Sequence, residues 1–556
     1  MKKLARSLAV IATLILLAGC AQLPRGGAIG VGPDIEFESD SNFLYYSPSA
    51  PSEGDSPQQI LSGFLSAGNG PQNDYAVARS YLTTGFQRDW QPSAEVLVQD
   101  GSPSFTFTTD SQAVAEITVS AVINSQGVYE SQPPGTKRYL NFELSKQAGE
   151  WRIVSAPNLT SLIRPNFSVL FKAYQLYFFD QNHSTLVPDV RWFPSRTSTA
   201  TQLVQALLQG PQSWMDQALA HDFPENTSLN LDAVTVVDGV ANVDLTGEAN
   251  GATVEQLAFM KAQLKATLLQ IPSVTSVSLS INKSPVTVPE LRVNVPSAAA
   301  ASLVTLDDSG LFGATGQSVV SLTNAGVDLL RDSNEFALSQ RAESLALSTT
   351  TSLYRLELSA LDKSPRVVDA RSKRLAPEFD AQGYLWSVGS AASSAWISAG
   401  KSSSSRISTR QLLSTPIKQF SLSPDGTRVA VLYAGQSSNI WLHSVIRDDS
   451  GRPLRLGAGI KIDNRYGQAL SIQWTDAINL AVLVRAENEG VRPTVMMVGG
   501  ETKTYPVVLG GVQMIANLSI PAILIKREDG TVVSYKSSSW VEVANQVRAM
   551  HFVTLG

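Results

Sequence analysis

One cysteine and four histidines limit the chemistry that this chain can offer. Cys20 is the single thiol of the 556 residues, and the histidines are His183, His221, His443 and His551. A lone thiol forms no intramolecular disulfide, and it is too few for an Fe–S cluster or a thiolate zinc site. Four scattered histidines supply few general bases or metal ligands. We therefore expect no metal centre and no cofactor.

Motifs for catalysis are nearly absent. The chain contains no G-x-S-x-G, H-E-x-x-H, Walker A or C-x-x-C pattern. The S-x-x-K match from Ser280 to Lys283 ends a predicted strand, whereas acyl-transfer enzymes place this motif on a helix, where the lysine reaches the serine. The acidic pairs Asp307-Asp308 and Asp448-Asp449 lack the alternating oxygen pattern of a calcium loop, which favours exposed turns. These patterns predict a protein that is not an enzyme.

The residues before Cys20 form a signal for lipid attachment. Lys2, Lys3 and Arg6 give a positive start, and the apolar run Leu8–Leu17 follows. A run of about ten residues is too short to cross a bilayer as a helix, which needs about 20, so it indicates a signal sequence. The small residues Ala and Gly then precede the cysteine directly. An ordinary secretory signal with a chance cysteine is the alternative.

This L-A-G-C pattern resembles the bacterial lipobox. The resemblance implies a signal peptide over residues 1–19, S-diacylglycerol and N-acyl modification of Cys20, and a lipid anchor on the extracytoplasmic face of the cell membrane. Cleavage would move the formal net charge from −5 to −8, because three basic residues are lost. Residues 20–55, rich in Gly, Pro and Ser, are expected to form a flexible tether. The lack of a basic surplus argues against nucleic-acid binding.

Two small α+β domains are expected after the tether. Residues 56–160 begin with a helical pattern and continue with alternating strands that end in G-E-W-R-I-V, an order that resembles NTF2-like or cystatin-like domains. Residues 165–290 combine L-L-x-G-P at 207–211, a D-G hairpin at 238–239 and a final V-x-x-V-x-L-x-I strand. This second set resembles the GerMN domain, which implies binding or scaffolding without chemistry.

Residues 295–556 are expected to form a β-propeller. Five segments start with an apolar residue and lead into an alternating strand, and their starts, Phe336, Phe379, Phe420, Ile472 and Ile515, recur every 40–50 residues. About five or six blades fit this length, and the last strand is a candidate for closing the ring by pairing before residue 336. Two stacked sandwiches are the alternative.

The tryptophans Trp386, Trp396, Trp441 and Trp474 recur in this region. They fit packing between blades better than a platform for sugars.

A lipobox, an NTF2-like domain, a GerMN domain and a propeller, in this order, resemble the LpqB family of actinobacterial lipoproteins. The resemblance implies binding to the extracytoplasmic domain of an MtrB-like sensor histidine kinase in a two-component system for cell-envelope and division homeostasis. Two alternatives stay open. Exposed tryptophans or an apolar cone at 56–160 would favour binding of a cell-wall glycan or lipid ligand. A buried acidic pair of raised pKa in the propeller channel would favour a hydrolase.

Overall fold

The fold is described from a computed structural model. It describes residues 48–554 apart from residues 72 and 197 and the segments 296–300, 314–317, 319–323, 359–363, 391–396, 401–403, 409–411, 413–414, 436–438, 463–466, 487–489 and 518–521. Cys20, the signal peptide and most of the tether therefore lie outside the described residues. Residues from 48 onward form one unit by their contacts. Within the described part, no helix combines the length and apolarity needed to cross a membrane.

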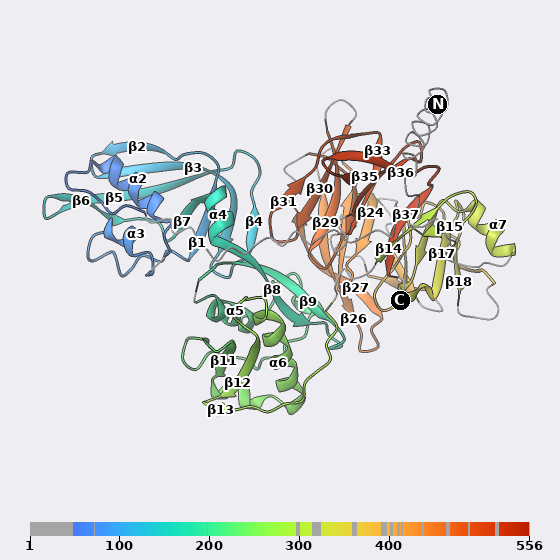
Figure 1. The fold of residues 1–556 in the computed structure, drawn as a ribbon, viewed down its shortest axis with the longest axis horizontal. Coiled ribbons are helices and arrows are strands. Elements are labelled where there is room, and N and C mark those ends of the chain that lie inside the picture. Colours follow the sequence, from blue (N-terminus) through green and yellow to red (C-terminus); the bar gives the residue numbers. More distant parts are fainter. Residues whose placement is uncertain are drawn as a thin grey trace, which may run out of the picture. The chain divides into compact units, whose positions relative to one another are not determined.

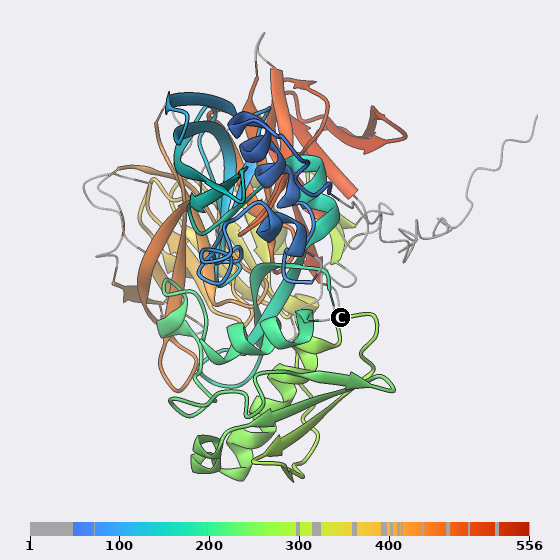
Figure 2. The same cartoon turned by 90° about the vertical axis from the view of Figure 1, so that its left-hand side faces the viewer.

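The first domain is the α+β domain that the sequence predicts (Figure 1). Ser56 starts helix α2 with a capping box, and Pro57 occupies its first turn. The sheet has the order β6-β5-β3-β1-β7, with β2 and β4 also paired to β3, and α2 and α3 lie over it (Figure 2). The elements are α2 (Pro57–Ala67), α3 (Ala76–Ser80), β1 (Glu95–Gln99), β2 (Ser104–Thr109), β3 (Gln112–Asn124), β4 (Tyr129–Ser131), β5 (Lys137–Gln147), β6 (Glu150–Ser155) and β7 (Thr160–Ile163).

Aromatic side chains fill the interior of this first domain. Trp90 is buried, with its ring centroid 5.0 Å from that of Phe64 and 6.2 Å from that of Tyr75. Its indole Nε1 donates to the carbonyl of Pro157 at 3.0 Å. Phe142 packs edge-on against Phe64 from the sheet side. Within the described residues, the protein's own side chains therefore fill the interior of this domain. The sequence analysis had left open an apolar cone for a ligand at this place.

The second domain begins with a long two-stranded sheet. Helix α4 (Arg164–Leu170) leads into β8 (Phe171–Phe179), which pairs antiparallel with β9 (Leu186–Pro194) along its whole length. The remainder is a four-stranded sheet, β10-β11-β12-β13, with β11 and β12 parallel across α6. The predicted D-G hairpin is confirmed, since Asp238 and Gly239 both have positive φ. These elements are α5 (Thr199–Leu208), β10 (Thr235–Val237), β11 (Val240–Leu245), α6 (Val254–Leu268), β12 (Ser276–Ile281) and β13 (Ser284–Pro285).

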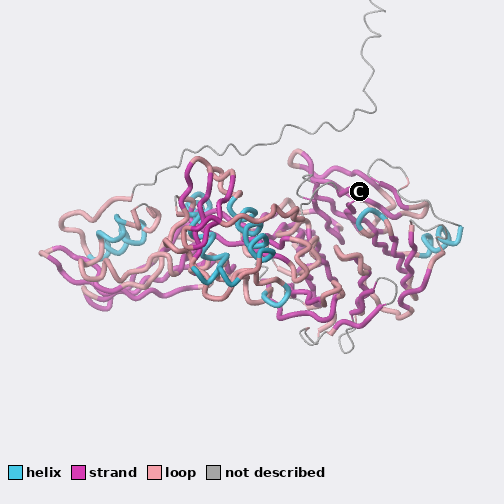
Figure 3. The backbone as a smooth tube through the Cα atoms, turned by 90° about the horizontal axis from the view of Figure 1, so that it is seen from below, coloured by secondary structure: helices cyan, strands magenta, loops and turns pink. Residues whose placement is uncertain are grey.

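The third domain is a ring of six sheets, which confirms the predicted propeller and contradicts two stacked sandwiches. Strands make up nearly all of its regular structure (Figure 3). The predicted repeat starts all lie on the first, innermost strands β16, β20, β24, β28 and β33. These five blades are β16–β19 (335–338, 344–348, 353–357, 366–369), β20–β23 (378–379, 385–388, 397–400, 404–407), β24–β27 (417–422, 428–433, 440–447, 453–462), β28–β32 (469–474, 479–485, 490–497, 502–504, 508–509) and β33–β36 (511–517, 522–527, 532–536, 539–544).

The sixth sheet closes the ring with both ends of the domain. Strand β37 (Ala549–Thr554) pairs antiparallel with β14 (Ala301–Leu306), from Leu306 opposite Ala549 to Ala301 opposite Thr554. β15 (Leu311–Gly313) extends this sheet on the outer side. The predicted closure by the last strand is therefore confirmed. It joins residues about 250 positions apart, so the ring holds only when the whole domain has folded.

Candidate functional site

The residues considered for acyl transfer are engaged in turn and strand structure. Ser280 Oγ donates to Asp244 Oδ1 at 2.7 Å, and the backbone N–H of Lys283 donates to the same oxygen at 2.8 Å. Ser280 lies on strand β12. The pair therefore anchors a turn, and the hydroxyl has a carboxylate partner instead of a base that would activate it.

The acidic pairs also serve turns, as the sequence predicts. Asp307 Oδ1 accepts backbone N–H groups from Ser309 and Gly310. Asp448 accepts from Ser450 and Arg452, and these hydrogen bonds, with the hydroxyl of Ser450 first, lower the pKa of Asp448 to about 2. Among the described residues, no group of three or more His, Cys, Asp or Glu side chains is placed to hold a metal.

Two of the propeller tryptophans are buried between blades. Trp386 donates through Nε1 to Asp380 Oδ2 at 3.0 Å, and Trp474 donates to the carbonyl of Ser421 at 3.1 Å. Trp441 is half-buried beside His443, and Trp396 lies outside the described residues. Packing between blades is therefore confirmed for Trp386 and Trp474, and a sugar platform built on them is excluded.

Two carboxyl groups with raised pKa lie on neighbouring inner strands, which the sequence analysis named as a mark of a hydrolase. Burial raises the pKa of Glu378 to about 8, and burial raises the pKa of Glu335 to about 7, with the Lys526 cation opposing the rise. However, Glu378 Oε2 accepts the backbone N–H of Leu422 on the next blade at 2.7 Å. This bond gives Glu378 a structural role.

Side chains at related positions on other blades also form hydrogen bonds to the backbone of the next blade. Gln419 Oε1 accepts from the N–H of Ile472 at 3.0 Å, and Gln513 donates to the carbonyl of Met550 at 3.5 Å. An innermost strand has one unpaired edge, and these side chains satisfy its backbone groups from the neighbouring blade. Glu378, whose pKa is raised, thus links two neighbouring blades by a hydrogen bond.

The strongest convergence of polar and aromatic groups lies where the β8–β9 hairpin meets the propeller. Every residue of β9 is buried. Trp192 Nε1 donates to the carbonyl of Gly499 in the fourth blade at 2.8 Å. The same indole packs within 5.6 Å of Tyr129 and 5.0 Å of Phe167, which belong to the first domain and α4. One side chain therefore contacts all three parts of the chain.

A buried ion pair on β9 extends this joint. Arg191 Nη2 donates to Asp189 Oδ2 at 2.7 Å, and the two side chains are at most 2% exposed. Arg191 also donates to the carbonyl of Gln126 in the first domain at 3.0 Å. Asp189 accepts the backbone N–H of Gln212 in the second domain at 3.0 Å. Buried charges are tolerated because each finds a partner.

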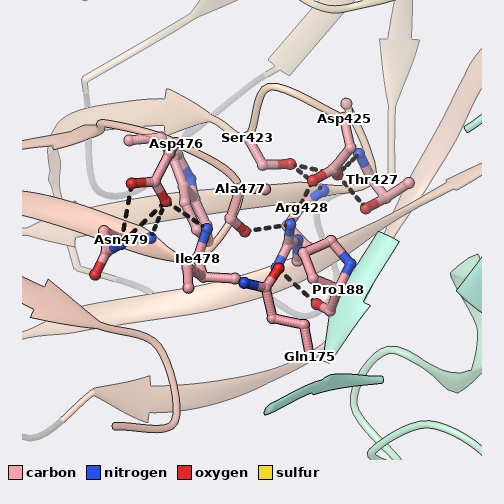
Figure 4. A network of polar contacts seen from close by, with 12 residues as sticks. Gln175, Pro188, Ser423, Asp425, Thr427, Arg428, Asp476, Ala477, Ile478 and Asn479 are labelled. Carbon is pink, nitrogen blue, oxygen red and sulfur yellow. Dashed lines mark hydrogen bonds and ion pairs between the residues drawn. The ribbon is translucent and has the colours of Figure 1, made fainter. Parts of the chain in front are cut away.

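Arg428 completes the joint from the propeller side (Figure 4). Its guanidinium pairs with Asp425, donates to the carbonyl of Ala477 at 2.7 Å, and donates to the carbonyl of Pro188 on β9 at 3.4 Å. Its Cζ lies 4.9 Å from the ring centroid of Trp474. We call Pro188, Trp192, Asp425, Arg428 and Trp474 the hairpin joint.

The Asp425 carboxyl in the joint stays charged despite complete burial. Burial acts to raise its pKa, but the Arg428 cation and the hydroxyl groups of Thr427 and Ser423 outweigh burial and hold the pKa below its usual value. Sequence reasoning missed the joint. The available signal was an arginine at position 428, where the alternating strand calls for an apolar residue.

Three family models match the chain in the order of its domains. The model described as "Lipoprotein LpqB, N-terminal domain" matches residues 50–168, "Sporulation and spore germination" matches 175–287, and "Lipoprotein LpqB beta-propeller domain" matches 309–550. The chain has the domain set of the LpqB lipoprotein family. None of the three models is that of a known enzyme family.

Curated relatives are named Lipoprotein LpqB, like two of the three family models. Lipoprotein LpqB of Thermobifida fusca is 29% identical over 326 residues, which cover 56% of this chain and 51% of that protein. The Corynebacterium jeikeium LpqB is 31% identical over 231 residues, covering 40% and 38%. The chain thus spans about half the length of the LpqB relatives that it matches, or less. The name of these relatives describes them as lipoproteins.

Solved structures match parts of the chain. The first GerMN domain of the sporulation protein GerM from Bacillus subtilis is 25% identical and covers 22% of this chain and 98% of that one, with a TM-score of 0.19. A putative TolB from Agrobacterium tumefaciens is 12% identical and covers 44% and 89%, with a TM-score of 0.32.

Proposed function

We propose that this chain is a membrane-anchored extracytoplasmic lipoprotein that binds and modulates an MtrB-like sensor histidine kinase in cell-envelope and division homeostasis. The LpqB domain set is the observation that carries the proposal. The resemblance to LpqB proteins suggests the kinase as partner. The anchor is Cys20, whose lipidation places the body beside other membrane proteins.

The described structure supports binding through contact area instead of turnover. The hairpin joint holds the first domain, the second domain and the propeller through buried hydrogen bonds and aromatic contacts. A partner that touches two domains would therefore meet a surface that is already organised, which lowers the conformational entropy lost on binding. Among the described candidates for catalysis or sugar binding, Ser280, Trp386 and Glu378 have structural partners.

The glycan or lipid-ligand alternative is weakened by the described residues. Trp386 and Trp474 are buried in the blades, and Trp90 with Phe64 and Phe142 fills the described core of the first domain. The kinase proposal therefore stands as the main one.

Crosslinking in intact cells tests the kinase proposal. A photocrosslinking residue would be placed at exposed positions of each domain, and captured partners would be identified by mass spectrometry. We expect the kinase among the partners captured from at least one domain. Its absence from every position, with other membrane proteins captured normally, would contradict the proposal.

A further inference from the structure

The two ends of the propeller are distinct, and strand direction assigns each residue to one of them. Within each blade, successive strands are antiparallel. The last strand of one blade and the first strand of the next are joined by short connections, as between β19 and β20. All innermost strands therefore begin at the same end of the ring. The connections between first and second strands, and between third and fourth, lie at the other end.

The second domain contacts the end that holds the first-to-second and third-to-fourth connections. Ala477 lies between β28 and β29, Gly499 lies between β30 and β31, and Arg428 begins β25. All three positions belong to first-to-second or third-to-fourth connections. The hydrogen bond between Arg455, near the start of β27, and Gln217 is at this end too. We call it the docked end, and the end where the inner strands begin is the opposite end.

Basic side chains gather at the opposite end, from the connection between blades one and two to blade four. The described residues at this end, from the β19–β20 connection to β30, include eight lysines and arginines and two acidic residues, Asp369 and Glu378. The basic arc consists of Arg371, Lys373, Arg374, Arg406, Lys418, Lys461, Arg485 and Arg492, and all but Arg374 are exposed. By sequence alone, the segments 409–411, 463–466 and 487–489, which lie outside the described residues, contain two arginines and three acidic residues. The arc stays positive in a chain whose net charge is −5.

Cations of this arc lie close enough to influence one another. Partial burial, together with the neighbouring Arg485 cation on the next blade, lowers the pKa of Lys418. Burial likewise lowers the pKa of Arg374, where Asp369 opposes the shift and Arg371 adds to it. Like charges brought together without enough counter-charge raise the local positive potential. An anionic partner would relieve this repulsion.

Exposed aliphatic side chains lie at the same end, beside the arc. The segment between blades four and five presents Val507, Leu509 and Val512, which are 42%, 66% and 38% exposed. Leu509 pairs with Gly490, the first residue of β30, and Val512 follows the first residue of β33. Both positions belong to the opposite end. Basic groups next to protruding aliphatic groups are the combination that binds anionic bilayers, through headgroups and acyl chains respectively.

We propose that the basic arc and the Val507–Val512 segment form a second membrane-contact surface, which binds the headgroups of anionic phospholipids. The charge favours anionic lipid, and the aliphatic side chains favour a bilayer over a soluble acidic protein. The docked end contacts the second domain, which leaves the opposite end for the bilayer in this proposal. This proposal goes beyond kinase binding and does not require it.

Vesicle flotation tests the proposal without the lipid anchor. Residues 21–556, the whole chain after Cys20, are mixed with phosphatidylcholine vesicles or with vesicles in which about one third of the lipid is phosphatidylglycerol. We expect binding to the anionic vesicles only, and weaker binding at higher salt. A basic residue near an anionic surface contributes about 1 kcal/mol, or roughly fivefold in affinity. The triple variant Lys373→Gln, Lys418→Gln, Lys461→Gln should therefore bind roughly 100-fold more weakly.

Matched variants separate a defined surface from general charge attraction. Lys172→Gln, Lys283→Gln and Lys536→Gln remove the same charge from exposed positions outside the arc and should leave vesicle affinity nearly unchanged. Leu509→Ser should weaken binding severalfold, whereas Val254→Ser, at a similarly exposed helix residue, should not.

Absence of binding to anionic vesicles, or equal losses in the two triple variants, would overturn the proposal. It would also be overturned if the arc variant bound vesicles normally and lost only its binding to the kinase domain, because the arc would then be a protein-docking surface.

Discussion

Single residues account for the joint between the domains, and Arg428 is the most important of them. Its side chain is 2% exposed and pairs with Asp425, which is fully buried. Replacing Arg428 with Met leaves the Asp425 charge buried without its partner. Such a loss destabilises a protein by about 3–5 kcal/mol. We expect this drop in the free energy of unfolding, measured by urea denaturation.

The exposed pair Arg452–Asp448 gives the control, because Arg452→Met removes the same kind of interaction from a solvated turn. Equal losses in the free energy of unfolding for the two substitutions would contradict a structural role for Arg428 in the joint.

Glu378 predicts how stability depends on pH. Its pKa is raised to about 8 in the folded protein, against an ordinary value of 4.5. The folded state therefore holds this proton more tightly than the unfolded state, and the resulting stability is lost as pH rises from about 4.5 to about 8. Glu378→Gln keeps a hydrogen-bonding side chain without the ionisation. We expect the variant to lose less stability than the wild type between pH 5 and pH 8, followed by thermal unfolding. Parallel pH profiles would contradict this role.

At the scale of helices, strands and turns, much of the structure was predictable from the sequence. The D-G hairpin, the helix after Ser56 and the five repeat starts were all predictable, because they depend on local turn chemistry and on the spacing of apolar residues. Strands β8 and β9 were also predictable as strands. What β9 contacts was not, because its burial on all sides depends on pairings with Gly127 and Gly499, far away in the sequence.

The joint could not be predicted for the same reason. Arg428 finds its partners at Pro188 and Ala477, at sequence separations of 240 and 49 residues. A single sequence shows an arginine in a strand and gives no sign of these carbonyl groups. Glu378 was missed likewise, because its amide partner lies on another blade.

The turn between β3 and β4 tests the contact between the first domain and the hairpin. Gly127 has φ +78°, and a Cβ there would lie 2.9 Å from both the Phe193 ring and the Trp192 carbonyl oxygen. Gly127→Ala should therefore add a steric clash, costing about 1–3 kcal/mol, to the backbone strain of positive φ. Gly101→Ala is the matched control, because φ is +79° and a Cβ meets nothing within 4 Å. Denaturation midpoints should fall further for Gly127→Ala; equal shifts would contradict the packing.

At the scale of the whole molecule, the first question is attachment. Cys20 is the only thiol, so Cys20→Ala removes the only site for the diacylglyceryl group. Each buried methylene that is lost weakens membrane attachment by about 0.8 kcal/mol. We expect radiolabelled palmitate to enter the wild-type chain and not the variant. Labelling of the variant would contradict the lipoprotein assignment, whatever the outcome for the basic arc.

The central claim is that the three joined domains act as a binding surface for a membrane sensor kinase. Isothermal titration of residues 21–556 with the kinase's extracytoplasmic domain, at low and at physiological salt, tests this claim most directly. We predict a Kd in the micromolar range that rises with salt, because a net-acidic chain is steered to a partner by charge. Absence of binding at both salt concentrations, with both proteins folded, would contradict the claim.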